Sequence, residues 1–456
     1  MVGGELCSVT WEDFRGFLSY LEDNGELKRI TKETDPKFEV SAYARKSCDV
    51  GGPAFLFERV KGFRGWRYAT ALYATRKRVM EGMGCKAESE VIPKYREAVA
   101  TPIPPRIVGG GPCKEVILKG DDVDLTKIPL AWHSGLDAGY YVTSAVEIAK
   151  DPGAGTYLLG IHRLQLRGKN TLAFWGPAEK RIGRAFLKAQ DLGRPLDIAI
   201  TLANDPVVDL ASQAKVSHDV DKMAIAGGLK GSPIELVKCE TVDVEVPKGC
   251  EVVIEGQILP NSQAPEGPFG EVTGVYSGTT KSPSIRVTAV TMRKDPIMHT
   301  VLAGNSPSEN GNMVIPAMLE AVSRVASLAS PEVKAVNVVG NSYYTILISI
   351  KKRHEGEPWN VISAVLGGVY PTKYCYVFDD DIDVYDPNDV QWAIETRMQP
   401  HSDVHIFPVM VGAPLDPSAP MQRHSSKMGL DCTIPLGADR AHFQKVKVPG
   451  AEDVTW

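Results

Sequence analysis

Residues 251–292 read EVVIEGQILPNSQAPEGPFGEVTGVYSGTTKSPSIRVTAVTM and are the most informative stretch of the chain for its fold and chemistry. Two runs rich in Val, Ile and Thr, Glu251–Ile258 and Ile285–Met292, predict β-strands. Between them, Glu266-Gly-Pro-Phe-Gly-Glu271 places two carboxylates five positions apart. Because Pro268 and the glycines oppose a helix, we expect this pair on a turn or at a strand end.

Two interpretations of this hexapeptide are open. Neighbouring acids perturb each other's protonation, which general acid–base catalysis requires. A hairpin turn carrying two solvated glutamates is the simpler interpretation when the hexapeptide is considered alone. The rest of the chain is therefore needed to choose between them.

The composition is that of an ordinary soluble protein of two or three domains. The chain has 456 residues, 43% of them hydrophobic and 23% charged, with a net charge of −5. A negative net charge argues against general nucleic-acid binding. No apolar run predicts a membrane span or a signal peptide. Eight cysteines without a Cys-x-x-Cys pair indicate free thiols, so we expect a cytoplasmic protein.

The N-terminal part predicts a helix followed by strands. Thr10 is placed to cap a helix in which Phe14 and Leu18 recur at helical spacing, and Gly25 would end it. The proline- and glycine-rich residues 101–112 predict a linker and a domain boundary.

Beyond that linker, short strands dominate up to about residue 310. They are predicted at Tyr141–Ile148, Tyr157–Leu166, Leu196–Leu202, Ile234–Glu245, Glu251–Ile258 and Ile285–Met292. Such a density of short strands is typical of a barrel or a sandwich. The last part alternates helices and strands, which indicates an α/β unit. We therefore expect an α+β protein with domains at residues 1–108, 109–310 and 311–456.

Four segments together carry a resemblance to a known family. They are Gly160-Ile-His-Arg-Leu-Gln165, Gly227-Gly-Leu-Lys-Gly-Ser-Pro-Ile-Glu-Leu-Val-Lys-Cys239, Glu266-Gly-Pro-Phe-Gly-Glu271 and Ser425-Ser-Lys-Met-Gly-Leu-Asp431. With the acidic run Asp379–Asp383 and Glu395-Thr-Arg-Met398, this set resembles the UbiD-type decarboxylases over nearly the whole chain. Within that family, the sequence pattern most resembles that of the members acting on hydroxybenzoates.

The resemblance implies both a fold and a reaction. The implied fold has an N-terminal α/β domain, a central split β-barrel similar to flavin reductases, and a C-terminal α/β domain that forms homo-dimers or hexamers. The implied cofactor is prenylated FMN, supplied by a separate flavin prenyltransferase. Losing CO2 directly from an sp2 carbon leaves an unstable anion, so a covalent cofactor adduct must accept the electrons. The implied substrates are aromatic or heteroaromatic, α,β-unsaturated carboxylic acids.

Carried over residue by residue, the family's Glu–Arg–Glu set falls on Glu266, Arg163 and Glu271. Glu271 would donate the proton after CO2 leaves, and Arg163 would hold Glu266 or the substrate carboxylate through its planar fork. In isolation, Arg163 would be interpreted as a surface arginine on a strand. Beside the two matched glutamates, the resemblance favours the catalytic interpretation.

The resemblance also implies contacts to the cofactor. The residues implied are Ile161, His162, Arg163, Trp175, Gly176, Lys180, Arg181 and Glu235. His162 flanks Arg163 on the opposite face of the predicted strand, which is more typical of a structural residue.

The expected metal site departs from the family pattern. Glu235 would bind Mn²⁺ or Mg²⁺ that holds the flavin phosphate, with K⁺ beside it on carbonyls around Ala224–Ala226. The other two ligand positions are Leu158 and Arg181, and neither side chain coordinates a cation. We hypothesise that Arg181 replaces the divalent ion and bridges Glu235 and the phosphate. There are two alternatives: another oxygen ligand supplies the metal site, or cofactor binding is weakened or lost.

Three functions remain open at this point. They are decarboxylation of an aromatic acid, carboxylation of an aromatic ring with CO2, and a non-catalytic subunit of a multisubunit carboxylase. The first two share a transition state, so the sequence does not choose the direction. The missing metal ligands favour the third. In each case we expect a homo-oligomer with no nucleic-acid or membrane partner.

Overall fold

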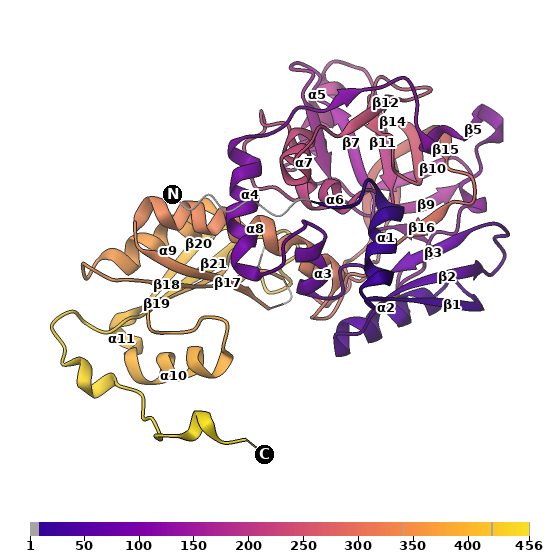
Figure 1. Cartoon of the computed structure of the whole chain (residues 1–456). Helices are drawn as coiled ribbons and strands as arrows, with labels where there is room; N and C mark the ends of the chain where they lie inside the picture. Colours follow the sequence, from indigo (N-terminus) through magenta and orange to yellow (C-terminus); the bar gives the residue numbers. More distant parts are fainter. Residues whose placement is uncertain (1–8, 341, 421–422, 456) are drawn as a thin grey trace. The chain divides into compact units, whose positions relative to one another are not determined.

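The computed structural model describes residues 9–340, 342–420 and 423–455, apart from the side chain of residue 452. The chain divides into two compact units with the boundary between Glu320 and Ala321 (Figure 1). The three-domain division predicted from the sequence stays a prediction.

The helices are α1 (Phe14–Asp23), α2 (Glu39–Val50), α3 (Arg76–Glu81), α4 (Val91–Ala100), α5 (Arg181–Asp191), α6 (Pro206–Ser212), α7 (Lys222–Lys230), α8 (Glu309–Ala329), α9 (Glu357–Gly368), α10 (Pro387–Arg397) and α11 (Pro400–Asp403). The strands of the first unit are β1 (Leu27–Thr34), β2 (Ala54–Val60), β3 (Arg67–Thr70), β4 (Arg106–Ile107), β5 (Val116–Lys119), β6 (Tyr141–Val142), β7 (Val146–Lys150), β8 (Tyr157–Gly160), β9 (Leu164–Gly168), β10 (Thr171–Phe174), β11 (Leu196–Leu202), β12 (Glu235–Lys238), β13 (Glu245–Pro247), β14 (Val252–Glu266), β15 (Thr280–Met292) and β16 (Ile297–His299). Those of the second unit are β17 (Val333–Val339), β18 (Thr345–Ile350), β19 (Tyr374–Asp379), β20 (Val404–Val411) and β21 (His424–Cys432).

A nine-stranded sheet forms the centre of the first unit. Its order is β6-β9-β10-β15-β14-β11-β7-β8, with β5 paired to β15. The long antiparallel pair β14 and β15 runs through its middle and ends where Glu266 faces Thr280. The first and last strands of this order do not pair within the described residues, so the sheet is open. The fold is mixed α/β, and the predicted split barrel is not confirmed.

The N-terminal helix α1 begins at Phe14 rather than near Thr10. Asp13 caps it, because its carboxylate accepts the Gly16 N–H at 3.0 Å. The cap predicted at Thr10 is therefore wrong, since an aspartate closer to the helix satisfies the free backbone donors. Strand β1 then joins the separate four-stranded sheet β1-β2-β3-β16.

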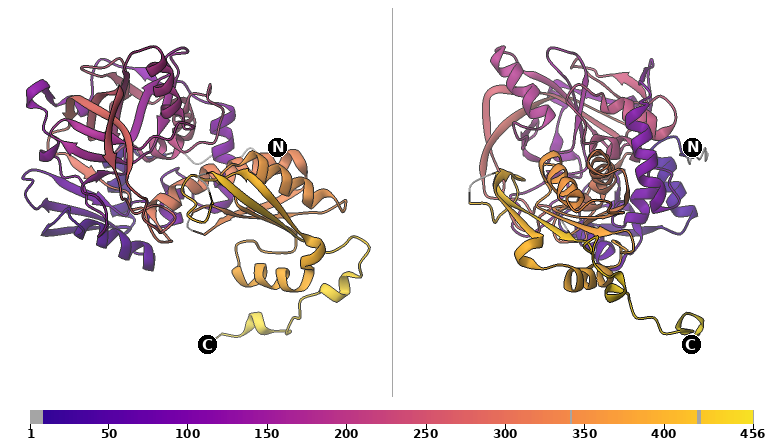
Figure 2. Two further views of the ribbon diagram at one scale, coloured as in Figure 1. Left: turned by 180° about the vertical axis from the view of Figure 1, so that it is seen from behind. Right: turned by 90° about the vertical axis from the view of Figure 1, so that its left-hand side faces the viewer.

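The second unit is a five-stranded sheet with helices on both faces (Figures 1 and 2). Residues alternate sides along β21: Leu430 lies in the apolar cluster with Ala393 of α10, whereas its neighbour Gly429 lies against Ile362 of α9. This arrangement agrees with the alternation of helices and strands expected there.

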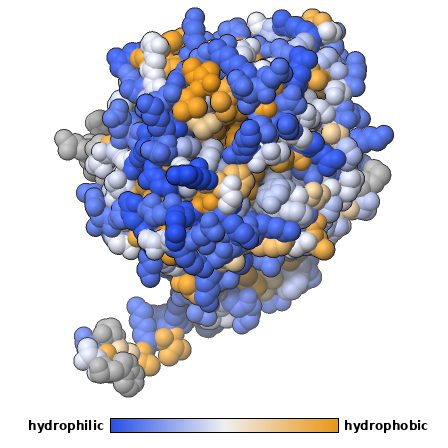
Figure 3. Space-filling view, turned by 90° about the vertical axis from the view of Figure 1, so that its right-hand side faces the viewer, coloured by the Kyte–Doolittle hydropathy of each residue, from blue (hydrophilic) through white to orange (hydrophobic). Residues whose placement is uncertain are grey.

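The face in Figure 3 is mostly hydrophilic, with apolar residues gathered in patches between charged and polar ones. In the described part of the chain, no helix has both the length and the apolar character needed to cross a membrane.

Two buried carboxyl groups predict a pH-dependent stability of the first unit. Burial raises the pKa of Asp209 to about 8 and that of Glu309 to about 7. The folded state therefore keeps protons that the unfolded chain releases above the ordinary carboxyl pKa of about 4. The free energy of unfolding must then fall as the pH rises from about 4 towards 8.

We expect the melting temperature to be lower at pH 8 than at pH 5.5, and Asp209→Asn to flatten this slope. The amide keeps the shape of the side chain that accepts from Tyr73 and Asn204. Thermal unfolding over a pH series measures the slope, with Asp243→Asn, 89% exposed, as the control. Equal slopes in all three proteins would contradict the assignment to Asp209.

Candidate active site

Two strands of the nine-stranded sheet, β9 and β14, bring Arg163 beside the two glutamates. Arg163 immediately precedes β9, and Glu266 is the last residue of β14. The order β9-β10-β15-β14 places these strand ends at one region of the sheet. The turn after Glu266 then returns Glu271 to the same guanidinium. The residues that the hexapeptide and the earlier motif predicted are thus assembled in one buried cluster.

The guanidinium of Arg163 binds both carboxylates at once. Its Nε donates to Glu266 Oε1 at 2.6 Å and its Nη2 to Glu266 Oε2 at 2.8 Å, a bidentate pair. Its Nη1 donates to Glu271 Oε1. All three side chains are buried, so water screens these charges weakly. The cluster is not the solvated hairpin turn of the simpler interpretation.

The turn between the glutamates depends on its glycines. Gly267 has φ +85°, and a Cβ atom there would lie 2.4 Å from the Gly278 carbonyl oxygen. Its N–H donates to Gln165 Oε1 at 3.2 Å, and the Gly270 N–H donates to Asp137 Oδ1 at 2.8 Å. These bonds fix the backbone on both sides of Pro268, so the two carboxylates are held at a set separation.

Burial within the cluster shifts Glu271 towards its protonated form. Burial raises the pKa of Glu271, and the nearby Arg163 charge only partly opposes this. Burial alone would lower the pKa of Arg163, but its bond with Glu266 and the charge of Glu271 raise it instead. An acid with a raised pKa beside a permanent cation can act as a proton donor.

The predicted flavin contacts fall into two groups around this cluster. The Trp175 ring centroid lies 4.5 Å from the Arg163 guanidinium carbon, and Gly176 follows directly. Ile161, His162, Lys180 and Arg181 line a separate cavity of about 190 Å³. His162 is also held by Glu147, whose Oε2 lies 3.0 Å from its Nδ1, in agreement with the structural role expected for it.

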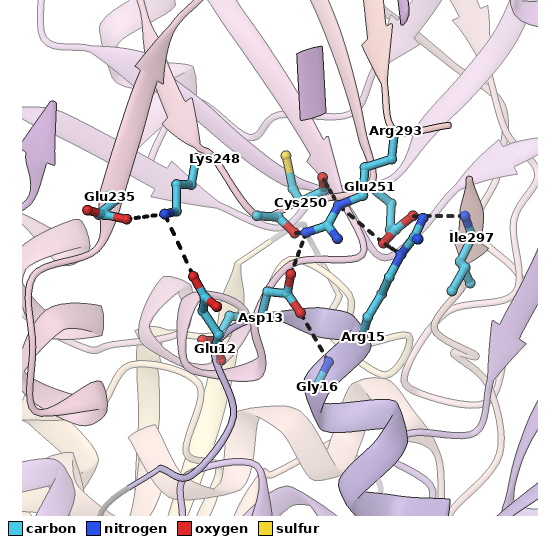
Figure 4. A network of polar contacts seen from close by, with 12 residues as sticks. Glu12, Asp13, Arg15, Gly16, Glu235, Lys248, Cys250, Glu251, Arg293 and Ile297 are labelled. Carbon is cyan, nitrogen blue, oxygen red and sulfur yellow. Dashed lines mark hydrogen bonds and ion pairs between the residues drawn. The ribbon is translucent and has the colours of Figure 1, made fainter. Parts of the chain in front are cut away.

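Glu235 lies apart from that cavity. It opens β12 opposite Arg106 of β4, and it forms ion pairs with Arg106 and Lys248. Figure 4 shows Lys248 between Glu235 and Glu12, and the Lys248 Nζ lies 3.7 Å from Glu12 Oε1. Because the cross-strand partner is an arginine, the carboxylate is already engaged there.

Among the described residues Arg181 forms no ion pair with Glu235, and the bridge through the phosphate stays a prediction. Arg181 donates instead to backbone carbonyls, to Val220 at 2.7 Å and to Val216 at 3.3 Å, and also to Ser217. Spacing along the chain does not report which cavity a strand residue faces, so the sequence could not place Glu235 relative to Arg181.

The divalent metal expected beside Glu235 does not fit this donor set. Leu158 packs into the apolar core with Phe174 and Ile182. No group of three or more His, Cys, Asp or Glu residues within the described ranges could hold a metal ion. Ala224–Ala226 lie inside α7, where carbonyls accept helical N–H groups one turn later, and the Ala224 carbonyl also accepts the Ile103 N–H. Binding of K⁺ there stays a prediction without support from this geometry.

Several site residues escaped the sequence analysis. Asp137 and Gln165 accept from the turn and Ser277 accepts from Arg163, and only these long-range contacts reveal their roles. Lys215 and Lys222 join Lys180 and Arg181 in the 190 Å³ cavity. Lys222 had a usable signal, because a lysine in the first turn opposes the helix dipole.

Comparison with known families identifies the relatives of this chain. Residues 18–94 match the N-terminal domain of 3-octaprenyl-4-hydroxybenzoate carboxy-lyase, residues 106–306 its Rift-related domain, and residues 312–432 its C-terminal domain. An uncharacterised protein of Synechocystis, sll0936, is 32% identical over 94% of this chain and 91% of its own length.

Two solved structures are similar over almost all of the chain. The UbiD-class enzyme HmfF from Pelotomaculum thermopropionicum, in complex with FMN, is 39% identical with a TM-score of 0.91, covering 97% of this chain and 99% of its own. Vanillic acid decarboxylase of Sedimentibacter hydroxybenzoicus is 29% identical with a TM-score of 0.88, covering 97% of both chains.

Proposed function

We propose, since this chain belongs to the UbiD family of carboxy-lyases, that it catalyses the reversible decarboxylation of an aromatic or heteroaromatic carboxylic acid. The observation that carries the proposal is the buried Arg163 guanidinium that binds Glu266 and Glu271 together. A structural ion pair needs no second acid, whereas a decarboxylase must return a proton to the carbon that loses CO2.

The cofactor proposed for this reaction is prenylated FMN. The 39% identical HmfF structure contains FMN, and an evolved dimeric form of that enzyme, 38% identical, contains prFMN. When bound, such a flavin supplies an acceptor for the electrons left behind by CO2. Trp175 offers an aromatic face beside Arg163, and the cations around Arg181 fit a phosphate.

Each side chain of the cluster has a distinct task in this proposal. Arg163 holds Glu266 in a bidentate pair, and Glu266 in turn fixes the plane of the guanidinium. Glu271 Oε1 accepts from Arg163, and Oε2 would carry the transferred proton. Its raised pKa keeps that proton available, and the reverse reaction would return the proton to the same oxygen.

The other two functions considered receive different support. Carboxylation of a ring uses the same groups and differs only in the CO2 supply. A non-catalytic subunit would have no use for a buried Glu–Arg–Glu cluster, so the assembled cluster supports catalysis. A homo-oligomer and a flavin prenyltransferase as cofactor supplier are part of the proposal, together with cytoplasmic localisation.

Co-expression with a flavin prenyltransferase tests the function. We expect a coloured protein with flavin absorption that releases CO2 from at least one acid in a panel of furoic, hydroxybenzoic and cinnamic acids. Carbon dioxide release is measured with and without added Mn²⁺. A colourless protein, inactive on the whole panel, would support the subunit function instead.

A further inference from the structure

Four cationic side chains converge on the cavity of about 190 Å³ in the first unit. Lys180 and Arg181 approach it from the start of α5, Lys222 from the start of α7, and Lys215 from the segment between α6 and α7. These four residues form what we call the cationic cavity. The acid on its lining is Glu179, so positive charge prevails there.

This gathering of positive charge is unfavourable, as the lowered pKa values of two of the lysines indicate. Lys222 is buried, and burial together with Arg181, Lys215 and Lys180 holds its pKa well below the usual value. Burial and the charge of Lys180 lower the pKa of Lys215 to about 7. Like charges gathered in a poorly solvated cavity destabilise the fold unless a negative charge joins them.

Nearby acids offset this charge only in part. The Asp221 carboxylate accepts the Met223 and Ala224 N–H groups as the cap of α7. Asp219 and Asp221 attract Arg181, but burial still lowers the pKa of the arginine. Arg181 and Lys222 otherwise donate to backbone carbonyls, including that of Ser212 at 2.5 Å from Lys222 Nζ.

The backbone adds to the positive field. Helices α5 and α7 both begin at the cavity, at Arg181 and Lys222 respectively. Helix N-termini carry a partial positive charge and favour anions, which makes cations at these positions unfavourable on their own. Two helix starts and four cations therefore point to one ligand class, a compact anion with two charges.

We propose that the cationic cavity binds a phosphate monoester directly through Lys222, Lys215 and Arg181, without a divalent metal ion. That this ester is the phosphate of the flavin rests on the proposed function. The absence of a carboxylate and histidine cluster among the described residues supports the metal-free mode. The ammonium and guanidinium groups would then bind the phosphate directly, in place of the divalent metal ion that the family resemblance implies.

Calorimetric titration of the flavin-free full chain tests the proposal. The protein is treated with EDTA and titrated with FMN, riboflavin and inorganic phosphate. We expect FMN to bind without added metal, and riboflavin, which lacks the phosphate, to bind about 10- to 100-fold more weakly, as the loss of charge-assisted hydrogen bonds implies. Inorganic phosphate should compete with FMN.

Lys222→Met separates binding from folding. The apolar side chain removes one buried charge, so the melting temperature of the flavin-free protein should stay equal or rise, while FMN binding weakens about 10- to 100-fold. Lys215→Met should weaken FMN binding in the same sense. Lys127→Met, at an 80% exposed lysine, is the matched control and should change neither quantity.

The outcomes distinguish this proposal from the proposed function. Binding of FMN only after Mn²⁺ or Mg²⁺ is restored, or unchanged FMN affinity in Lys222→Met, would overturn the metal-free site and leave the decarboxylase in place. Binding of inorganic phosphate that Lys222→Met abolishes, without any flavin binding, would support the anion site and contradict the flavin enzyme.

Discussion

Glu271→Gln should reduce turnover about 10²- to 10⁴-fold, the usual contribution of a general acid, and leave the protein folded and able to bind flavin. Glutamine keeps the length of the side chain and can still accept from Arg163, but its amide cannot deliver a proton to carbon. Carbon dioxide release and flavin absorbance, measured on the same sample, separate the two effects.

Glu332→Gln makes the same chemical change on the surface and is the control, because this side chain is 37% exposed. A Glu271→Gln variant that retains full turnover would remove the residue from the proton-transfer step. A variant that loses flavin together with turnover would make Glu271 a binding residue.

Activity should also depend on pH in a direction set by Glu271. A proton donor with a raised pKa works below that pKa and loses activity as the pH rises through it. The basic limb of the pH profile for kcat/KM should therefore lie above the ordinary range of a glutamate, about 4.3. A profile that rises through that region would instead assign Glu271 the role of a base.

Arg163→Met should lower the free energy of unfolding by about 3–5 kcal/mol and abolish turnover, because Glu266 is left as a buried and uncompensated charge. Arg163 is the partner of both acids, and its loss removes the bidentate pair and the Glu271 bond together. Chemical denaturation measures the stability.

Arg29→Met is the matched control for Arg163→Met. Arg29 also binds two glutamates, Glu22 and Glu58, but its side chain is 46% exposed, so its removal should cost less than about 1 kcal/mol. Adding Glu266→Gln to Arg163→Met should recover part of the lost stability without restoring turnover. Equal losses in both single variants would contradict a buried, coupled cluster.

The sequence predicted regular elements well where a single physical signal dominated. The β-branched run predicted as a strand at Leu196–Leu202 matches β11 residue for residue. It failed where tertiary contacts interrupt a run. Tyr157–Leu166 looked continuous, but Ile161–Arg163 leave the sheet between β8 and β9 so that the arginine can reach the glutamates.

Helix α8 shows a similar limit. Proline favours the first turn of a helix, yet Pro316 lies inside α8, which begins earlier, at Glu309. The buried Glu309 carboxylate accepts the Tyr73 and Leu302 N–H groups, and such distant partners are invisible to a local pattern.

The candidate site was predictable in its chemistry and not in its surroundings. Arg163, Glu266 and Glu271 were found because glycine, proline and paired acids form a compact pattern in the sequence. The lysines of the cationic cavity come from separate segments, and only the fold brings Lys215 and Lys222 to Arg181. The same reason explains why the sequence did not show that Glu235 lines a different cavity from these lysines.

The most direct test of the central claim is the position of deuterium in the product. The protein loaded with prenylated FMN is incubated with its acid substrate in D2O, and the product is analysed by NMR and mass spectrometry. The account predicts a product with one deuterium on the carbon that carried the carboxylate. Glu271→Gln should form this product at least about 10²-fold more slowly than the wild type. A product labelled elsewhere, or labelled equally fast by the variant, would contradict it.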